Sequence, residues 1–341
     1  MANGKTASWT EKWIREEVIL RGRFAPSPTG LLHIGNALTA VLAWMHVRSQ
    51  GGEFLLRIED IDQQRCKSIF VDQLVEDLQW LGLDWDEGPD IGGPYMPYRQ
   101  RDRQTIYDAA FTKLLEQALL YPCYCSRSEL ADVLIAPHGW FADEPRYPGI
   151  CRHLKPHERV EKARHKAPAY RFRVPEQNIG FADEVYGEVN IRPSEGGDFI
   201  VRRSDSLMAY QLAVVVDDAA MGITHVLRGA DLLASTSRQL LLYRALGYDS
   251  PTFAHTPLLL DEYGRRIAKR NSTATLLGMR QAGVHPEEII GVIGWLLGLT
   301  DTADPLSLTE LLSCFSISRI PQSPLRLSVE CQKRLRINVT Y

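Results

Sequence analysis

Apolar and polar residues alternate along the first part of the chain in a way that predicts strands and helices in turn. Short apolar runs end at turn residues, and apolar positions at helical spacing follow them. The expected elements are a strand at 18–24, a helix at 31–48, a strand at 53–58 and helices at 67–81 and 101–120. Because strands that alternate with helices form parallel sheets covered by helices, we expect an α/β fold with helices on both faces of a parallel sheet.

The pattern lapses between residues 121 and 200, where eight prolines and three of the six cysteines lie. We interpret this stretch as an insertion into the sheet domain. Alternation resumes with an apolar segment at 209–216, a strand at 224–228, a helix at 235–246, a strand near 256–260 and an apolar helical region at 276–299. The expected divisions are an extension at 1–17, a sheet domain in two halves at 18–120 and 201–270, the insertion at 121–200, and a short helical region and tail at 271–341.

The composition is typical of a folded globular protein, since 45% of the 341 residues are apolar and 24% are charged. It excludes intrinsic disorder as the main state. The net charge of −3 means that binding to a nucleic acid would need a local basic patch. No apolar run reaches the roughly 18 residues of a membrane span, and residues 1–12 lack the apolar stretch of a secretory signal, so we expect a cytoplasmic protein.

Three cysteines, Cys123, Cys125 and Cys151, gather in the insertion. Six cysteines in 341 residues are too few for a disulfide scaffold. In a reducing compartment, such a cluster indicates a metal ion. The other three cysteines are scattered, and we expect them to be ordinary thiols.

A candidate nucleotide site lies at 23–36, where the first strand meets the first helix. The chain has neither a G-x-x-x-x-G-K-[ST] phosphate loop nor a G-x-G-x-x-G motif after a strand. Instead, free N–H groups at the helix start favour an anion, His33 adds a donor, and Gly35 lets a base or ribose approach the backbone. Packing of the helix start is the alternative explanation for these residues.

A second candidate is the basic segment 261–270, which has four cations within six residues. An ordinary solvated turn would have this composition. A mobile cationic loop that neutralises a triphosphate while pyrophosphate leaves would have it too.

Together these two stretches resemble the paired motifs of class I aminoacyl-tRNA synthetases. His33-Ile34-Gly35-Asn36 is similar to the family's His-Ile-Gly-His motif, and residues 266–270 are similar to its Lys-Met-Ser-Lys-Ser motif, of which only Lys269 is unchanged. Residues 23–30, 57–62 and 227–233 resemble the glutamyl branch. The resemblance covers residues 18–300 and implies an ATP-dependent ligase whose Rossmann-type catalytic domain is interrupted by a zinc-containing insertion.

Two features point, within that branch, to the enzymes that transfer glutamate to the queuosine base of tRNA(Asp). Only 71 residues follow Arg270, which leaves no room for the large helical anticodon-binding region of a full glutamyl-tRNA synthetase. The cysteine cluster also matches the family's zinc site, which uses a C-x-C pair followed by Tyr-x-x-x-Cys.

The resemblance assigns four zinc ligands to this chain: Cys123, Cys125, Tyr147 and Cys151. Four ligands close the coordination shell of structural zinc, so we expect a structural Zn²⁺. The 21 residues between Cys125 and Tyr147 exceed the family's usual spacing, and His153 or His138 is a rival ligand. Three free cysteines near a buried tyrosine are the alternative.

The resemblance also implies a glutamate site, lined by Arg23, Phe24, Ala25, Pro26, Ser27, Glu59, Tyr210 and Arg228. Arg23, Tyr210 and Arg228 would surround the side-chain carboxylate, while Glu59, helped by Ser27, would bind the ammonium. Arg228 would carry selectivity, because glutamine would leave this cation unpaired, at a loss of about a thousandfold in rate. Alternatively, Glu59 only pairs with Arg57, and Tyr210 belongs to the core.

For the nucleotide, the resemblance implies His33, Gly35, Asn36 and Lys269, with Mg²⁺ accompanying ATP. His33 and Lys269 are the expected catalytic residues. They would stabilise phosphate charge while the α-carboxylate of L-glutamate attacks the α-phosphorus and pyrophosphate leaves. A queuosine hydroxyl would then take the glutamyl group from AMP. We expect the adenylate to form without tRNA.

The expected partners are ATP, L-glutamate and tRNA(Asp) bearing queuosine, and we expect a monomer that binds no membrane. Candidates for RNA contact are Arg202, Arg203, Arg265 and Arg270. Two other functions stay open at this point. One is a shortened glutamyl-tRNA synthetase that charges a tRNA 3′ end, and the other is a non-catalytic RNA-binding paralogue.

Overall fold

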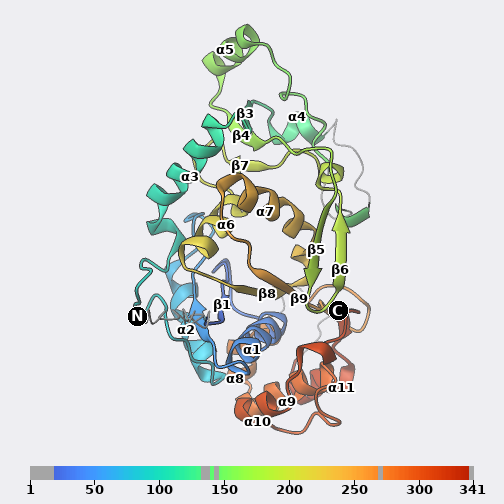
Figure 1. The fold of residues 1–341 in the computed structure, drawn as a ribbon. Coiled ribbons are helices and arrows are strands. Elements are labelled where there is room, and N and C mark those ends of the chain that lie inside the picture. The colour runs from blue at the N-terminus through green and yellow to red at the C-terminus, as the bar shows by residue number, and fades with distance from the viewer. Residues whose placement is uncertain (1–18, 132–138, 142–145, 268–271, 338–341) are drawn as a thin grey trace, which may run out of the picture.

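The centre of the molecule is a six-stranded sheet with the strand order β2-β1-β8-β9-β5-β6 (Figure 1). The computed structural model describes residues 19–131, 139–141, 146–267 and 272–337. The sheet strands are β1 (Arg21–Phe24), β2 (Glu53–Leu56), β5 (Ile179–Asp183), β6 (Gly187–Ile191), β8 (His225–Gly229) and β9 (Thr252–Thr256). All neighbouring pairs are parallel except β5–β6. The expected α/β fold with a largely parallel sheet is confirmed.

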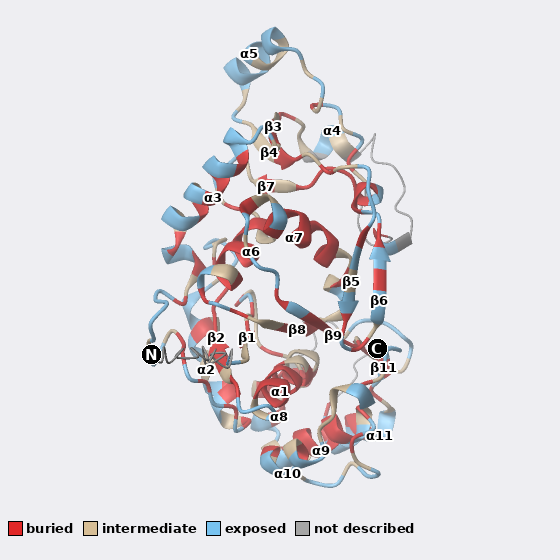
Figure 2. Ribbon diagram, viewed as in Figure 1, coloured by how far each residue is buried: buried red, intermediate tan, exposed pale blue. Residues whose placement is uncertain are grey.

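Side chains of the sheet alternate between two hydrophobic cores, one on each face. On β2, Phe54 and Leu56 join one core and Leu55 joins the other, and on β8 Leu227 and Val226 divide in the same way. The first core is covered by α1 (Ile34–Arg48) and α2 (Ser68–Trp80). The second is covered by α3 (Gln104–Glu116), α6 (Tyr210–Ala220) and α7 (Leu233–Leu246). Buried residues lie on both sides of the sheet, so helices cover both faces (Figure 2).

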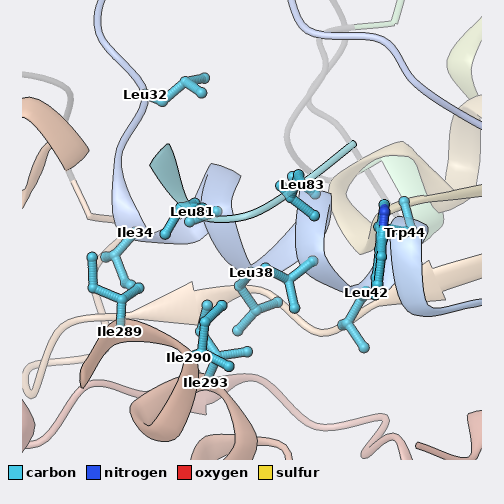
Figure 3. Close-up of a cluster of buried hydrophobic side chains, with 14 of the residues drawn as sticks. Leu32, Ile34, Leu38, Leu42, Trp44, Leu81, Leu83, Ile289, Ile290 and Ile293 are labelled. Carbon is cyan, nitrogen blue, oxygen red and sulfur yellow. The ribbon is translucent and has the colours of Figure 1, made fainter. Parts of the chain in front are cut away.

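Helix α1 is buried on nearly all sides. The reason is that α1 lies between the sheet and the C-terminal helices. Its Ile34 and Leu38 share a core with Ile289 and Ile290 of α9 (Pro286–Leu296) (Figure 3). Each such side chain stabilises the fold by about 1.5–3 kcal/mol when it is buried. This packing fixes α1 and therefore the position of its N-terminus.

The remaining C-terminal elements are small. They are α8 (Leu276–Gln281), β10 (Leu259–Leu260), α10 (Leu308–Ser313), β11 (Leu325–Arg326) and α11 (Val329–Arg334). The apolar region 276–299 therefore forms two helices, because the chain turns before Pro286 begins α9. The strand expected near 256–260 was wrong in position: β9 ends at Thr256, and residues 259–260 pair instead with the tail.

The insertion contributes a separate three-stranded sheet of β3 (Leu120–Cys123), β4 (Ala169–Phe172) and β7 (Ile200–Arg202). The short helix α4 (Arg127–Ala131) and α5 (Pro156–His165) also belong to this part of the chain, and α5 projects at its far end (Figure 1). Within the same stretch, β5 and β6 extend the main sheet through β9. None of the helices in the described ranges is long and apolar enough to span a bilayer.

Candidate active site

A cavity of about 580 Å³ opens where the carboxyl ends of β1 and β8 meet the start of α1. Ligands of parallel α/β sheets bind at this edge. Eleven residues expected from the sequence line the cavity together: Arg23, Phe24, Ala25, Pro26, Ser27, His33, Gly35, Asn36, Glu59, Tyr210 and Arg228. Segments nearly 200 residues apart therefore meet at one site.

At one end of the cavity, Arg23 is held in place by a buried carboxylate. Its Nε and Nη2 donate to the two oxygens of Asp218, at 3.1 and 3.4 Å, and Arg57 Nη1 donates to the same group at 2.7 Å. Burial alone would raise the pKa of Asp218, but the two guanidinium groups outweigh it and lower the pKa. Asp218 is therefore an anion that fixes two arginines.

Glu59 both pairs with Arg57 and lines the cavity. The ion pair with Arg57 and the expected position beside a ligand are therefore compatible. Arg57 Nη2 donates to Glu59 Oε1 at 3.2 Å. Burial raises the pKa of Glu59, although Arg57 and Arg23 oppose this shift. Among the described contacts the second carboxylate oxygen has no hydrogen-bond donor, which leaves it for a ligand.

Arg228 is 5% exposed and is surrounded by uncharged acceptors. Its Nε lies 3.1 Å from His255 Nε2, its Nη1 donates to Gln239 at 2.7 Å, and its Nη2 donates to Thr236 Oγ1 at 2.8 Å. No carboxylate in the described part of the chain forms an ion pair with it. Burial lowers the pKa of Arg228. A buried cation without an anion is energetically unfavourable, so this geometry suits an anionic ligand.

Tyr210 begins α6 and is half-buried beside the second core. It also lines the cavity together with Glu59 and the two arginines. Burial raises its pKa, so the phenol is a neutral hydrogen-bonding group. As with Glu59, the packing role and the position in the cavity coexist.

The other end of the cavity is the N-terminus of α1, which His33 caps. Its Nδ1 accepts from the backbone N–H groups of Gly35 and Asn36, at 3.1 and 3.3 Å, and Asn36 Oδ1 accepts from His33 N at 3.1 Å. The expectation of free helix-start N–H groups was therefore wrong for these two, because the imidazole occupies them. Since Nδ1 accepts, the ring proton lies on Nε2, the donor that a phosphate needs.

The structure gives a second reason for glycine at position 35. A Cβ there would lie 3.0 Å from the His33 ring. A side chain there would force the capping imidazole to shift by a few tenths of an ångström.

Described residues of the basic segment also line the cavity. Arg266 and Ile267 line the cavity, and Thr275 pairs with His33 as an isolated antiparallel bridge. Lys269, Arg270 and Ala268 lie outside the described residues. The described residues before and after 268–271 therefore lie close to the N-terminus of α1.

The expected zinc ligands come together in a small core of the insertion. Tyr147 Oη lies 3.4 Å from Cys123 Sγ and 3.8 Å from Cys125 Sγ, and the Sγ atoms of Cys125 and Cys151 are 3.6 Å apart. Tetrahedral zinc with ordinary bond lengths separates its ligands by roughly 3.5–3.8 Å, so these four atoms fit the ion. His153 is not in the metal-binding cluster found among the described residues, and His138 lies outside them.

A guanidinium supports this cluster. Arg171 Nε donates to Cys123 Sγ at 3.3 Å, and its Cζ lies 3.7 Å from the centre of the Tyr147 ring. The hydrogen bond from Cys151, together with Tyr147 and Arg171, lowers the pKa of Cys123 to about 4. Cys123 is therefore favoured as a thiolate, the form that binds metal. Burial raises the pKa of Cys125, and the hydrogen bond to Cys123 raises the pKa of Cys151.

The described arginines among those suggested for RNA contact already form contacts within the protein. Arg203 pairs with Asp62 and Asp205, Arg265 pairs with Asp261, and Arg202 lies over the ring of Phe111. Arg270 lies outside the described residues.

Several residues around the cavity were not anticipated from the sequence. Asp218 holds Arg23, and His255, Thr236 and Gln239 hold Arg228. The adjacent acids Asp217 and Asp218 within the apolar run of α6 are the one signal that could have indicated a buried network.

Comparisons with known proteins agree with this geometry. Residues 19–322 match the family model for tRNA synthetases class I (E and Q), catalytic domain. The chain belongs to this family. Two similar proteins are named glutamyl-Q tRNA(Asp) synthetase: that of Symbiobacterium thermophilum is 52% identical over 92% of this chain and 97% of its own length, and that of Nitratidesulfovibrio vulgaris is 45% identical over 93% and 98%.

Other class I synthetases match over a smaller share of their own length. The glutamate–tRNA ligase of Sulfurihydrogenibium sp. is 40% identical over 89% of this chain and 64% of its own. A crystal structure of a glutamate tRNA ligase from Elizabethkingia meningosepticum, in complex with its amino acid, has a TM-score of 0.79 and 30% identity over 93% of this chain and 68% of that one. The chain is thus a class I synthetase, and a ligase.

Proposed function

We propose that this class I synthetase activates L-glutamate with ATP and transfers it to the queuosine base of tRNA(Asp). The observation that carries the first half is Arg228, a buried guanidinium in the cavity that has no carboxylate partner among the described residues. An amino acid with a carboxylate side chain supplies the missing charge. A guanidinium binds a carboxylate through two parallel hydrogen bonds.

The remaining groups match the other ends of glutamate. Glu59, which also lines the cavity, has an oxygen for the ammonium, and Ser27 lines the same cavity. Arg23 and Tyr210 add donors for the side-chain carboxylate. This arrangement leaves the α-carboxylate for reaction.

The α-carboxylate oxygen would attack the α-phosphorus of ATP, forming the mixed anhydride as the bond to pyrophosphate breaks. The substrate supplies the nucleophile, so catalysis depends on alignment and charge stabilisation. His33 Nε2–H would donate to a phosphate oxygen, with Gly35 and Asn36 beside the nucleotide. Lys269 would balance the charge on pyrophosphate, and Mg²⁺ would accompany ATP.

The second step concerns the RNA. A hydroxyl of the cyclopentenediol ring of queuosine would attack the activated carbonyl, form an ester and release AMP. The two relatives named glutamyl-Q tRNA(Asp) synthetase support this acceptor, since they match at higher identity than the glutamate–tRNA ligases. Zn²⁺ would be held by Cys123, Cys125, Cys151 and Tyr147 and would stabilise the insertion. A cytoplasmic location and a monomeric state stay predictions.

Transfer of radiolabelled glutamate tests this function. The enzyme is incubated with ATP and tRNA(Asp) that contains or lacks queuosine, and the RNA is then cut with a nuclease. We expect label on the anticodon-loop fragment of the queuosine-containing RNA only. Label on the 3′-terminal fragment would support the second candidate, a shortened glutamyl-tRNA synthetase, which the 40% identity to glutamate–tRNA ligases favours. The absence of both label and adenylate would indicate a non-catalytic paralogue.

A further inference from the structure

Behind Arg228 lie two buried side chains, His255 and Asp183, that neither the motifs nor the proposed chemistry uses. Arg228 on β8 and His255 on β9 are partners in the parallel register. His255 Nε2 lies 3.1 Å from Arg228 Nε, and His255 Nδ1 lies 2.5 Å from Asp183 Oδ2 at the end of β5. His255 is fully buried and Asp183 is 3% exposed. Three neighbouring strands thus contribute one residue each.

The donors and acceptors of these three side chains have only one consistent assignment. The Nε–H of Arg228 can only donate, so His255 Nε2 must accept. The single ring proton of a neutral imidazole therefore lies on Nδ1 and is donated to Asp183. Burial lowers the pKa of His255 to about 4, which keeps the ring neutral at physiological pH.

The other carboxylate oxygen of Asp183 is fixed by the backbone. Its Oδ1 accepts from the N–H groups of Val185, Tyr186 and His255, at 3.1, 2.9 and 3.3 Å. The orientation of this carboxylate is therefore set by the turn between β5 and β6 and by β9. Through Oδ2 it sets the tautomer of the imidazole.

We propose that Asp183 and His255 are positioning residues that hold the Arg228 guanidinium in the orientation that selects a glutamate side chain. The inference rests on the proposed function, because it assigns the ligand of Arg228. A direct carboxylate partner would also orient this arginine, but it would neutralise the charge that the substrate must meet. A neutral imidazole fixes the plane of the guanidinium and keeps its charge available. Gln239 and Thr236, the other two side-chain acceptors, are uncharged as well.

Asp183→Asn tests this inference with an isosteric change. Three backbone N–H groups require an oxygen at the Oδ1 position, so the new amide nitrogen must face His255 Nδ1. This forces the ring proton onto Nε2, where it meets the N–H of Arg228. We expect ¹⁵N NMR of His255 to show the Nε2–H tautomer in place of Nδ1–H. We also expect at least a tenfold weaker glutamate affinity and a similar loss of preference for glutamate over glutamine in ATP–pyrophosphate exchange.

A pair of variants at His255 separates positioning from stability. In His255→Gln the side-chain oxygen reaches the place of Nε2 and still accepts from Arg228. In His255→Asn the shorter amide reaches only Asp183. We expect His255→Gln to keep most of the discrimination and His255→Asn to lose it, although both lower stability. This pair also decides the matter if Asp183→Asn does not fold.

Asp198→Asn is the matched control. Asp198 is a buried carboxylate of the insertion that accepts from Tyr121 and Arg152 and makes no contact with Arg228. It should lower the melting temperature but leave the preference for glutamate unchanged.

The inference is overturned if Asp183→Asn and His255→Asn, correctly folded, prefer glutamate over glutamine as strongly as the parent protein. It is also overturned if the parent His255 carries its proton on Nε2. Failure of the parent protein to exchange pyrophosphate with glutamate would instead reject the proposed function. The NMR measurement would then still decide whether Asp183 sets the tautomer that Arg228 meets.

Discussion

The two ends of the cavity are built in opposite ways. At the end proposed to bind glutamate, Arg23 and Arg228 are 4% and 5% exposed. Arg23 donates to a buried carboxylate of α6, and Arg228 donates to side chains of β9 and α7. At the end proposed to bind phosphate, Arg266 lines the cavity from the segment after β10, and its side chain is 57% exposed. One end therefore holds charges oriented in advance, and the other holds a cation that water screens.

This difference separates two tasks of a ligase. Recognition of a small charged side chain needs groups whose orientation is fixed before the substrate arrives, since that lowers the entropy lost on binding. Charge that develops on pyrophosphate exists only during the reaction, and a loop can meet it there. We therefore expect changes at the glutamate end to alter selectivity and changes at the phosphate end to alter rate.

The largest effect is expected for Arg228→Gln. Loss of the cation removes the charge that distinguishes glutamate from glutamine, so kcat/KM for glutamate in pyrophosphate exchange should fall by about a thousandfold. Activity with glutamine should fall much less. Arg203→Gln, which changes a half-exposed arginine paired with Asp62, is the control and should keep the preference. Unchanged discrimination in the Arg228 variant would remove this residue from the glutamate site.

Lys269→Ala should have the next largest effect, on rate alone. Loss of one group that stabilises transition-state charge lowers the rate by about 100- to 1000-fold. Glutamate affinity, measured by calorimetry, should stay nearly unchanged because the glutamate end is built by other elements. Arg265→Gln, in the same loop but paired with Asp261, should lower the rate far less. Equal losses of rate and glutamate affinity in the lysine variant would contradict the division of tasks.

Cys151→Ser tests the cysteine cluster, none of whose members lines the cavity. Metal analysis of the purified variant should give less than about 0.2 zinc per chain, against the one ion that a four-ligand site holds. The melting temperature should fall, because metal binding contributes to folding. Cys331→Ser, at a buried cysteine outside the cluster, should keep its zinc. Zinc-free parent protein would reject the site.

The smallest effect concerns Asp77 of α2, a buried carboxylate with no arginine partner, in contrast to Asp218. Burial raises the pKa of Asp77 to about 6, and its Oδ2 has no hydrogen-bond partner among the described residues. The folded state therefore binds this proton more tightly than the unfolded chain does, so Asp77 destabilises the fold above pH 6 and less so as the pH falls toward 4.

Asp77→Asn should consequently raise the free energy of unfolding by about 1–2 kcal/mol at pH 8, with a smaller gain at pH 4.5. Urea unfolding at the two pH values measures both. A gain that does not depend on pH would show that the charge of Asp77 is not the cause.

The early strands and helices were predictable because their apolar periodicity is local. The helix expected at 31–48 is found as α1 at Ile34–Arg48, so its end was predicted and its start lies later than expected. The position of β9 was not predictable, since residues 252–260 hold apolar residues on both sides of Pro257 and only pairing with β8 decides which part joins the sheet.

The site residues that belong to motifs were predictable, and those outside the motifs were not. Arg23, Glu59 and Arg228 belong to recognisable segments, and the structure brings them to one cavity. Asp183 and His255 belong to ordinary strand sequences, and their role depends on contacts between strands more than 70 residues apart. Such long-range hydrogen bonds leave no local pattern.

Glutamate-dependent ATP–pyrophosphate exchange without any tRNA tests the central claim most directly, because it needs only the cavity and its two ends. The account predicts exchange with glutamate in the absence of RNA, and about a thousandfold lower kcat/KM with glutamine. No exchange with glutamate, or equal exchange with both amino acids, would contradict it.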